Sequence, residues 1–207
     1  FDGNEYQTVL IGNQLWMAEN LNSLHYFDGV PIYEVWAYDM NPDNASIYGR
    51  LYTWEAAVKD TSSNSIPSGI QGACPSGWHL PSIGEWRLLT DYLGGEEIAG
   101  GKLKETGLNH WFEPNTDATN VSGFSALPGG YRADNGEFQV LGYTGFFWST
   151  TVSVLDETSF KETLWIGNAT SNASFMGVGE SDEAYSIRCV KNEIVSKTLG
   201  LNEDELY

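Results

Sequence analysis

The chain has 207 residues, 41% of them hydrophobic and 18% charged, a balance typical of one globular domain and unlike that of a disordered chain. Its net charge of −18 repels phosphate backbones, which argues against nucleic-acid binding and against docking on anionic lipid. No apolar run approaches the roughly 20 residues of a membrane helix, so we expect no membrane insertion of this chain.

The N-terminal half begins with Phe1 rather than Met, which is typical of a mature or trimmed form. A β-hairpin is predicted over residues 4–16, because strand-forming residues flank the two-residue turn Gly12-Asn13. The stretch that follows, to about residue 50, combines aromatic residues with turn-forming pairs and is predicted to be irregular. A first helix is expected over residues 52–60, where apolar side chains recur at helical spacing.

A second helix is predicted to start after Ser82 and to continue to Leu93. Ser82 and Glu85 form an S-x-x-E capping box, which satisfies backbone N–H groups at a helix start. Apolar residues then follow one face, and Gly94 stands where a left-handed C-cap belongs. Both ends of this helix are therefore marked in the sequence.

The second half of the chain is predicted to contain a short amphipathic turn at 100–106, a long loop region at 109–132 and then strands. Five strands are expected, at residues 137–143, 145–153, 163–169, 173–179 and 184–192. The composition, with 23 glycines and 14% aromatic residues, also favours short strands and many turns over a helical bundle. Residues 193–207 have weak helical periodicity and an acidic end, so we predict a tail or a short docked helix there.

Cys74 and His79 are close enough in sequence to suggest a nucleophile with its base, which needs direct hydrogen-bond contact. An extended chain would separate them by about 16 Å, so we interpret His79 as a buried or half-buried histidine beside Trp78. His25 and His110 are distant and lack a metal-binding spacing. The residues thus predict no catalytic or metal site, and the two cysteines leave open one disulfide or two buried thiols.

The segment HWFEPN contains Glu113 and Asn115 on either side of Pro114. A cis bond before this proline would direct both side-chain oxygens to one side. Oxygen pairs of this kind suit Ca²⁺ and, through the ion, sugar hydroxyls. The alternative is an ordinary acidic loop. The sequences Asp134–Gly136 and Asn41–Asn44 are predicted to be turns before they are calcium ligands.

Seven stretches, in unbroken order from residue 2 to about residue 192, carry a resemblance to a known family. They are DGNEYQTVLIGNQLWMAENL, YGRLYTWEAAV, CPSGWHLPSIGEWRLLTDYLGG, GKLKE, SGFSALPGGYR, FFWSTT and YSIRCVKN. Together they resemble the Fibrobacter succinogenes major paralogous domain. The resemblance implies an extracellular or cell-surface protein of Bacteroidetes or their relatives, often lipid-anchored. It also implies a single domain over residues 1–192, followed by the tail.

At the level of fold, the helix, extended GWHLP, capped helix and final IRCV strand resemble C-type lectin-like proteins and their formylglycine-generating-enzyme branch. The resemblance implies an α+β fold in which two helices pack on small twisted antiparallel sheets with long irregular loops. It also implies a long-range disulfide between Cys74 and Cys189. The enzyme branch uses late cysteines or histidines, yet no second cysteine lies near Cys189. The lectin branch pairs E-P-N with a later W-N-D, and here Ser149 and Thr150 stand in its place.

These observations predict a non-enzymatic binding or adhesion module, without a cofactor unless Ca²⁺ joins the oxygen pair. Its expected ligand is a glycan or a surface protein, held on the loop surface from residue 109 to 135 by Trp111, Glu113, Asn115 and Tyr131. Two alternatives are a metal-dependent enzyme of the formylglycine-generating or iron-histidine type, in which His25, His79 and His110 converge, and a structural spacer in a surface assembly.

Overall fold

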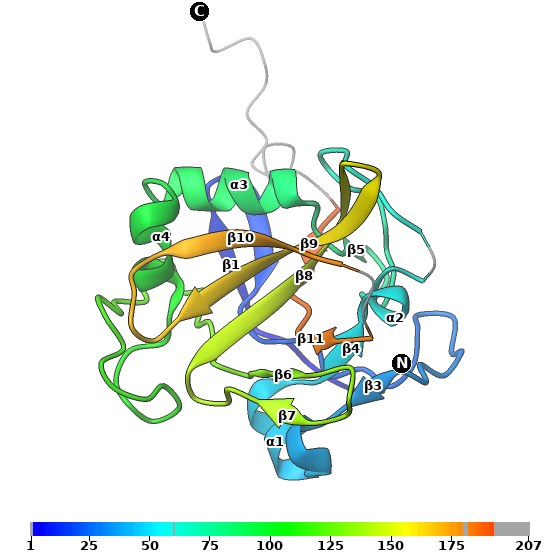
Figure 1. Cartoon of the computed structure of the whole chain (residues 1–207), viewed down its shortest axis with the longest axis horizontal. Coiled ribbons are helices and arrows are strands. Elements are labelled where there is room, and N and C mark those ends of the chain that lie inside the picture. Colours follow the sequence, from blue (N-terminus) through cyan, green and yellow to red (C-terminus); the bar gives the residue numbers. More distant parts are fainter. Residues whose placement is uncertain (1, 60, 180–181, 193–207) are drawn as a thin grey trace, which may run out of the picture.

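The chain has a mixed α+β structure, and the computed structural model describes residues 2–59, 61–179 and 182–192 (Figure 1). Within these ranges it contains four α helices, one 3₁₀ helix and three antiparallel sheets. The predicted α+β class is therefore confirmed. The tail or docked helix predicted for residues 193–207 lies outside the described residues, so the proposed domain limit at residue 192 remains a prediction.

One sheet brings the two ends of the described chain together, and its strand order is β1-β2-β12-β5. The predicted N-terminal hairpin is confirmed as β1 (Thr8–Ile11) and β2 (Gln14–Met17), joined by the two-residue turn. In β12 (Val190–Lys191), Val190 pairs with Trp16 of β2 on one side and with His79 of β5 (Trp78–His79) on the other. The last described strand thus closes the fold against the first.

The other two sheets come mostly from the second half of the chain, as the predicted strands require. A three-stranded sheet, in the order β10-β9-β8, consists of β8 (Thr144–Leu155), β9 (Thr158–Gly167) and β10 (Ala173–Val178). A five-stranded sheet follows the order β3-β4-β11-β6-β7, with β3 (Val35–Trp36), β4 (Leu51–Thr53), β11 (Ala184–Tyr185), β6 (Tyr131–Arg132) and β7 (Phe138–Gln139).

The expected pair of helices is present as α2 (Trp54–Val58) and α3 (Ile83–Tyr92), but two more helices make the prediction of two too low. Helix α1 (Pro42–Tyr48) follows the 3₁₀ helix η1 (Tyr38–Met40) in the stretch predicted to be irregular. Helix α4 (Glu96–Leu103) replaces the predicted turn at 100–106 and starts four residues earlier. In α3, the backbone N–H groups of Glu85 and Ser82 donate to each other's side-chain oxygens, which confirms the capping box.

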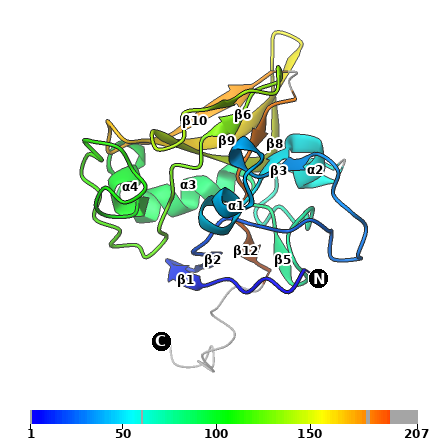
Figure 2. The same ribbon diagram turned by 90° about the horizontal axis from the view of Figure 1, so that it is seen from below.

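Helix α3 lies between the three-stranded sheet and the β1–β2 hairpin (Figure 2). Trp86 on this helix is fully buried, and its ring stacks on Trp16 with centroids 4.5 Å apart. The Trp86 Nε1 donates to the carbonyl of Trp148 in β8 at 3.3 Å. Since Trp16 belongs to β2, these indoles connect α3 to two sheets and lie together in one of the two large core clusters. Trp86 is thus a core residue, whereas Trp78 is only half-buried.

A disulfide joins Cys74 to Cys189 across 115 residues, with both cysteines fully buried. The pairing implied by the resemblance to C-type lectin-like proteins is therefore confirmed. Cys189 directly precedes β12, so the bond attaches the closing strand to the segment that leads into β5. Across the described ranges, no helix has the length and apolar character that crossing a membrane requires.

Candidate functional site

The candidate site is a short loop segment with two buried ends and three exposed residues between them. At one end, Trp111 is 0% exposed, and its Nε1 donates to the carbonyl of Ala126 at 2.9 Å. At the other end, Asn115 is 7% exposed. Residues 112–114 between these anchors are all exposed. Because both ends are fixed in the interior, the exposed residues are presented on the surface in a defined position.

Asn115 fixes its end of the segment through its side-chain amide. The Asn115 Nδ2 donates to the carbonyls of Glu105 and Gly107 at 3.0 and 2.8 Å, which connects two neighbouring loops. Two carbonyls can only accept, so the amide nitrogen must face them. The amide oxygen, Oδ1, is buried and has no hydrogen-bond partner among the described residues. Leaving such an atom unpaired costs about 1–3 kcal/mol in a typical protein interior.

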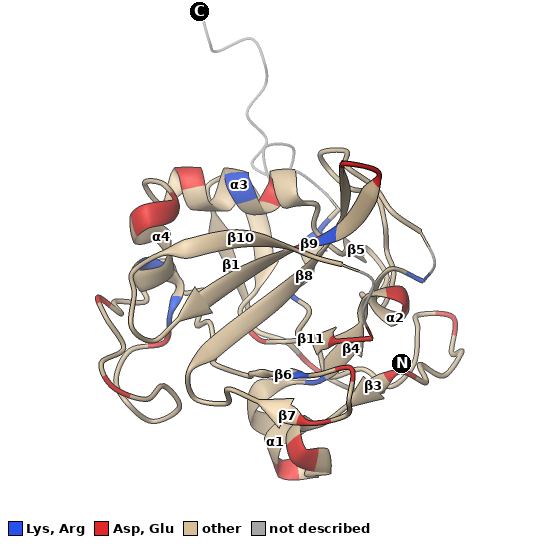
Figure 3. Ribbon diagram, in the orientation of Figure 1, with Lys and Arg blue, Asp and Glu red and all other residues tan. Residues whose placement is uncertain are grey.

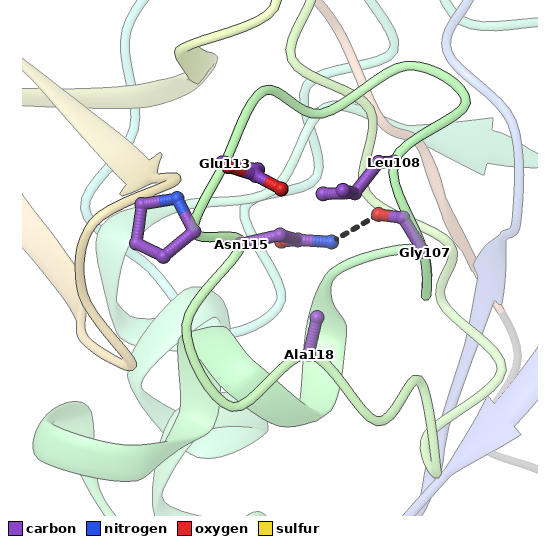
Figure 4. A pocket seen from close by; sticks show the side chains of 6 residues that line it. Gly107, Leu108, Glu113, Asn115 and Ala118 are labelled. Carbon is purple, nitrogen blue, oxygen red and sulfur yellow. Dashed lines mark hydrogen bonds between the residues drawn. The ribbon is translucent and has the colours of Figure 1, made fainter.

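The peptide bond between Glu113 and Pro114 is cis. This is the bond geometry that, according to the sequence analysis, would direct the two side chains to one side. In Figure 4 the Glu113 and Asn115 side chains extend from the loop toward the same side, where Gly107 and Leu108 lie. The Glu113 carboxylate is exposed, and it makes no hydrogen bond or ion pair to any other described residue. It is therefore available to accept hydrogen bonds from a ligand.

A surface pocket of about 410 Å³ lies along this segment. Its lining consists of Gly107, Leu108, Glu113, Pro114, Asn115 and Ala118. The volume falls within the range of about 300–1,000 Å³ that is usual for small-molecule sites. The lining combines apolar surface with the Glu113 carboxylate, so the pocket can contact an apolar part and a hydroxyl of one ligand.

A buried lysine holds the site loop on its interior side. Lys104 is 0% exposed, and its Nζ donates to three carbonyls, those of Thr116, Gly167 and Thr170, at 2.8, 3.1 and 2.8 Å. Desolvation by burial lowers the pKa of Lys104 to about 8, although the nearby Asp117 carboxylate acts in the opposite direction. The ammonium group thereby ties the end of α4 to the site loop and to the end of β9.

Two of the four predicted ligand-binding residues lie away from the pocket surface. Trp111 packs in the core, so its fully buried indole is not positioned to stack on a sugar. Tyr131 on β6 is not among the residues that line the pocket. Its ring instead packs against Phe146 and Tyr185, and its hydroxyl donates to Gln139 at 2.9 Å. The structure therefore brings Glu113 and Asn115 together and leaves Trp111 and Tyr131 with packing contacts.

Two other aromatic residues, which the sequence analysis missed, are exposed beside Glu113. Phe112 is 52% exposed and Tyr143 is 49% exposed, and their rings meet edge to face with centroids 4.8 Å apart. Their segments are joined because the Phe112 N–H donates to the carbonyl of Gly142 at 2.8 Å. No periodicity in the loop indicates that Phe112, rather than Trp111, faces outward. Phe112 and Tyr143 are distant in the sequence, so their contact depends on the tertiary structure.

The three histidines do not converge, because each one pairs with a different carboxylate. His25 Nδ1 lies 2.6 Å from Asp2, His79 Nε2 lies 2.7 Å from Glu85, and His110 Nδ1 lies 2.8 Å from Glu105. The first and last pairs are partly exposed, whereas His79 and Glu85 are each 3% exposed. The predicted burial of His79 is therefore confirmed, and its pairing with the helix-capping Glu85 is a contact that the sequence analysis missed.

The pocket lining supplies too few oxygen ligands for a calcium ion. Among its lining residues, Glu113 supplies the one carboxylate, and Asn115 supplies a buried amide oxygen. Calcium takes six to eight oxygen ligands in proteins, so these two oxygens do not complete its coordination. Elsewhere in the described ranges, no group of three or more His, Cys, Asp or Glu side chains is placed to hold a metal. We therefore assign no binding step at this site to a metal ion.

Comparison with known proteins gives one match. The model of the Fibrobacter succinogenes major domain family covers residues 9–191, which includes every described strand and helix except the first residue of β1. No curated protein and no solved structure matches the chain.

Proposed function

This chain belongs to the Fibrobacter succinogenes major domain family, and we propose that it is a non-enzymatic binding or adhesion module for a glycan or a surface protein. We place the ligand at the pocket formed by the loops at residues 107–108 and 113–118. The observation that carries the proposal is the Glu113 carboxylate, which is exposed beside this pocket and unpaired among the described residues.

A binding role fits the way in which the loop is held. Trp111 and Asn115 fix the exposed residues from both sides, and Lys104 fixes the following residues through the Thr116 carbonyl. A surface that is already ordered loses less conformational entropy when a ligand binds. The separate carboxylate partners of the three histidines favour structural roles for these side chains over a shared catalytic centre.

The finer fold that we propose is C-type lectin-like. Two features support it: the pairing of β12 with β2, which places both ends of the described chain in one sheet, and the long-range disulfide Cys74–Cys189. An experimental structure superposed on C-type lectin domains tests this proposal. A different order of strands in the superposition would contradict it.

We also propose an extracellular or cell-surface location, which the family resemblance implies. Disulfides form and persist in oxidising compartments, so the fully buried Cys74–Cys189 bond supports this location. Protease treatment of intact native cells tests it. Loss of the domain from intact cells would support a surface position, whereas protection in intact cells and cleavage only after lysis would contradict a cell-surface location.

The binding proposal is tested with an array that carries neutral and acidic glycans together with collagen and fibronectin. The labelled chain is applied with and without calcium, alongside the Glu113→Gln variant. Because the substitution removes the acceptor charge and little volume, we expect the bound signal to fall about tenfold or more.

The matched control is Glu157→Gln, which changes an exposed carboxylate in the β8–β9 turn. This control is expected to bind as the wild type does. Failure of the wild type to bind any array component would overturn the proposed function. Equal binding by wild type and Glu113→Gln would instead show that the ligand lies at another surface.

A further inference from the structure

We propose that Phe112 and Tyr143, whose rings are inclined to each other by 74°, form an aromatic platform for a neutral pyranose sugar. The sugar ring stacks on one aromatic ring and is flanked by the other, and its hydroxyls are bound by Glu113. This inference rests on the proposed binding function and makes it more specific. It assigns the ligand class, an uncharged oligosaccharide, and it assigns the aromatic residues that hold it. These two residues take the place that the sequence analysis gave to Trp111 and Tyr131.

Both rings are exposed yet held in place. The Phe112 ring lies against the backbone of Gly142, where an added Cβ would come within 2.8 Å of a ring carbon. The Phe112 carbonyl accepts a hydrogen bond from Nδ2 of Asn168 at 3.3 Å, and the neighbouring Glu113 carbonyl accepts another from the same nitrogen at 2.8 Å. The Asn168 N–H donates to the carbonyl of Tyr143 at 2.9 Å. Asn168 therefore joins the two halves of the platform.

A ligand at this site would meet an aromatic surface together with a carboxylate. In the sequence, Phe112 is followed directly by Glu113 and Pro114, both of which line the pocket, whereas Phe112 and Tyr143 themselves are not among its lining residues. A pyranose ring has an apolar C–H face and a rim of hydroxyl donors. Sites that bind such molecules combine aromatic surface with a few polar groups that fix orientation. Here the Phe112 ring is available to the apolar face of the sugar, and the Glu113 carboxylate is available to its hydroxyls.

The negative charge of the molecule and of the pocket favours an uncharged ligand. Acidic residues are spread around the described part of the molecule, and basic residues are few (Figure 3). The pocket lining contains Glu113 and no Lys or Arg, and the whole chain carries a net charge of −18. An acidic sugar would lose its hydration and gain no cation at this site. The expected ligand is consequently an uncharged sugar.

The experiment is a calorimetric titration of the whole chain with three neutral probes, cellohexaose, mannohexaose and chitohexaose, and one acidic probe, tetragalacturonate. We expect at least one neutral probe to bind and the acidic probe not to bind. Because one ring stacks on the sugar and the other flanks it and holds the first ring in place, Phe112→Ala and Tyr143→Ala are each expected to weaken binding about tenfold. Phe112→Tyr retains a ring and is expected to restore most of the affinity.

The matched control is Phe27→Ala, because Phe27 is 51% exposed, close to the value for Phe112, and its ring lies near Lys59 rather than near Tyr143 or Glu113. Wild-type affinity in Phe112→Ala, together with a loss in Glu113→Gln, would overturn the platform and leave the binding function standing. Array binding to collagen or fibronectin without binding of any neutral sugar would overturn the assigned ligand class alone. Binding of tetragalacturonate in preference to the neutral probes would also overturn it.

Discussion

His79 and Glu85 form an ion pair in the protein interior, with the imidazole Nε2 2.7 Å from the carboxylate Oε1 and each side chain 3% exposed. The other ring nitrogen, Nδ1, lies 2.9 Å from Oδ1 of Asn192, an atom that can only accept a hydrogen bond. Two oxygen acceptors therefore face the two ring nitrogens, and this arrangement favours the protonated imidazole. The same carboxylate caps α3 by accepting from the Ser82 N–H, so the pair connects the helix start to the last described residue.

This pair predicts a pH dependence of stability. Burial by itself lowers the pKa of His79, but the hydrogen bond and charge of Glu85 outweigh it and raise the pKa above the ordinary 6.5. Between 6.5 and the raised value the folded chain binds more protons than the unfolded chain, so the free energy of unfolding falls as pH rises through this window. Urea denaturation at intervals from about pH 5.5 to about pH 8.5 measures the fall.

In the variant His79→Gln we expect the free energy of unfolding not to fall with pH in this window. We also expect it to be about 3 kcal/mol lower than in the wild type near pH 6, because the substitution leaves Glu85 buried without its cation. The control is His25→Gln, which breaks a pair whose histidine side chain is 34% exposed and is expected to cost about 1 kcal/mol or less. An unchanged pH profile in His79→Gln would show that other groups cause the dependence.

Lys104 predicts a pH dependence of opposite sign. Its folded-state pKa of about 8 lies below the ordinary 10.5, so the unfolded chain binds more protons between these values and the free energy of unfolding rises with pH there. Lys104→Met removes this rise and leaves three carbonyls without their donor, at a cost of about 3 kcal/mol near neutral pH. Denaturation curves of both proteins at about pH 7.5 and at about pH 9.5 provide the test, with the difference between them assigned to this lysine.

Removal of the disulfide is expected to destabilise the chain strongly. The bond between Cys74 and Cys189 closes a loop of 115 residues, and in the chain-entropy model a loop of this size is worth about 4–5 kcal/mol. The double variant Cys74→Ala/Cys189→Ala should lose this amount in a denaturant titration. Wild type measured with a strong reductant serves as the comparison, and a loss below about 1 kcal/mol in both would contradict the chain-entropy argument here.

Gly142 offers a test of how Phe112 is positioned. Gly142→Ala places a Cβ within 2.8 Å of the Phe112 ring and at a φ of +83°, so the ring must move and the free energy of unfolding should fall by about 1–2 kcal/mol. The control Gly69→Ala has a similar φ of +72° and nothing within 4 Å, so it shares the backbone strain without the collision. Crystal structures or ring-proton chemical shifts should show a displaced Phe112 in Gly142→Ala alone.

Local signals in the sequence were sufficient for several elements. The turn at Gly12-Asn13 and the capping box of Ser82 and Glu85 act within a few residues, so their effect does not depend on the rest of the fold. Helix α1 shows the limit of such reasoning. Asn41 caps it and Pro42 is its first residue, yet the same pair is also typical of a turn. Local chemistry allowed both outcomes, and of the residues of the short helix only Ala45 is buried, so the apolar pattern did not distinguish them.

By itself, the sequence determined the α+β class, the ends of α3 and the family, and its resemblance to C-type lectin-like proteins implied the pairing of Cys74 with Cys189. Tertiary structure alone decided which side chains face solvent at the site. Trp111 and Phe112 are adjacent aromatic residues in a loop without periodicity, so neither has an intrinsic preference for the interior. Contacts with residues distant in sequence, Ala126 for one and Gly142 for the other, bury the indole and leave the phenyl ring on the surface.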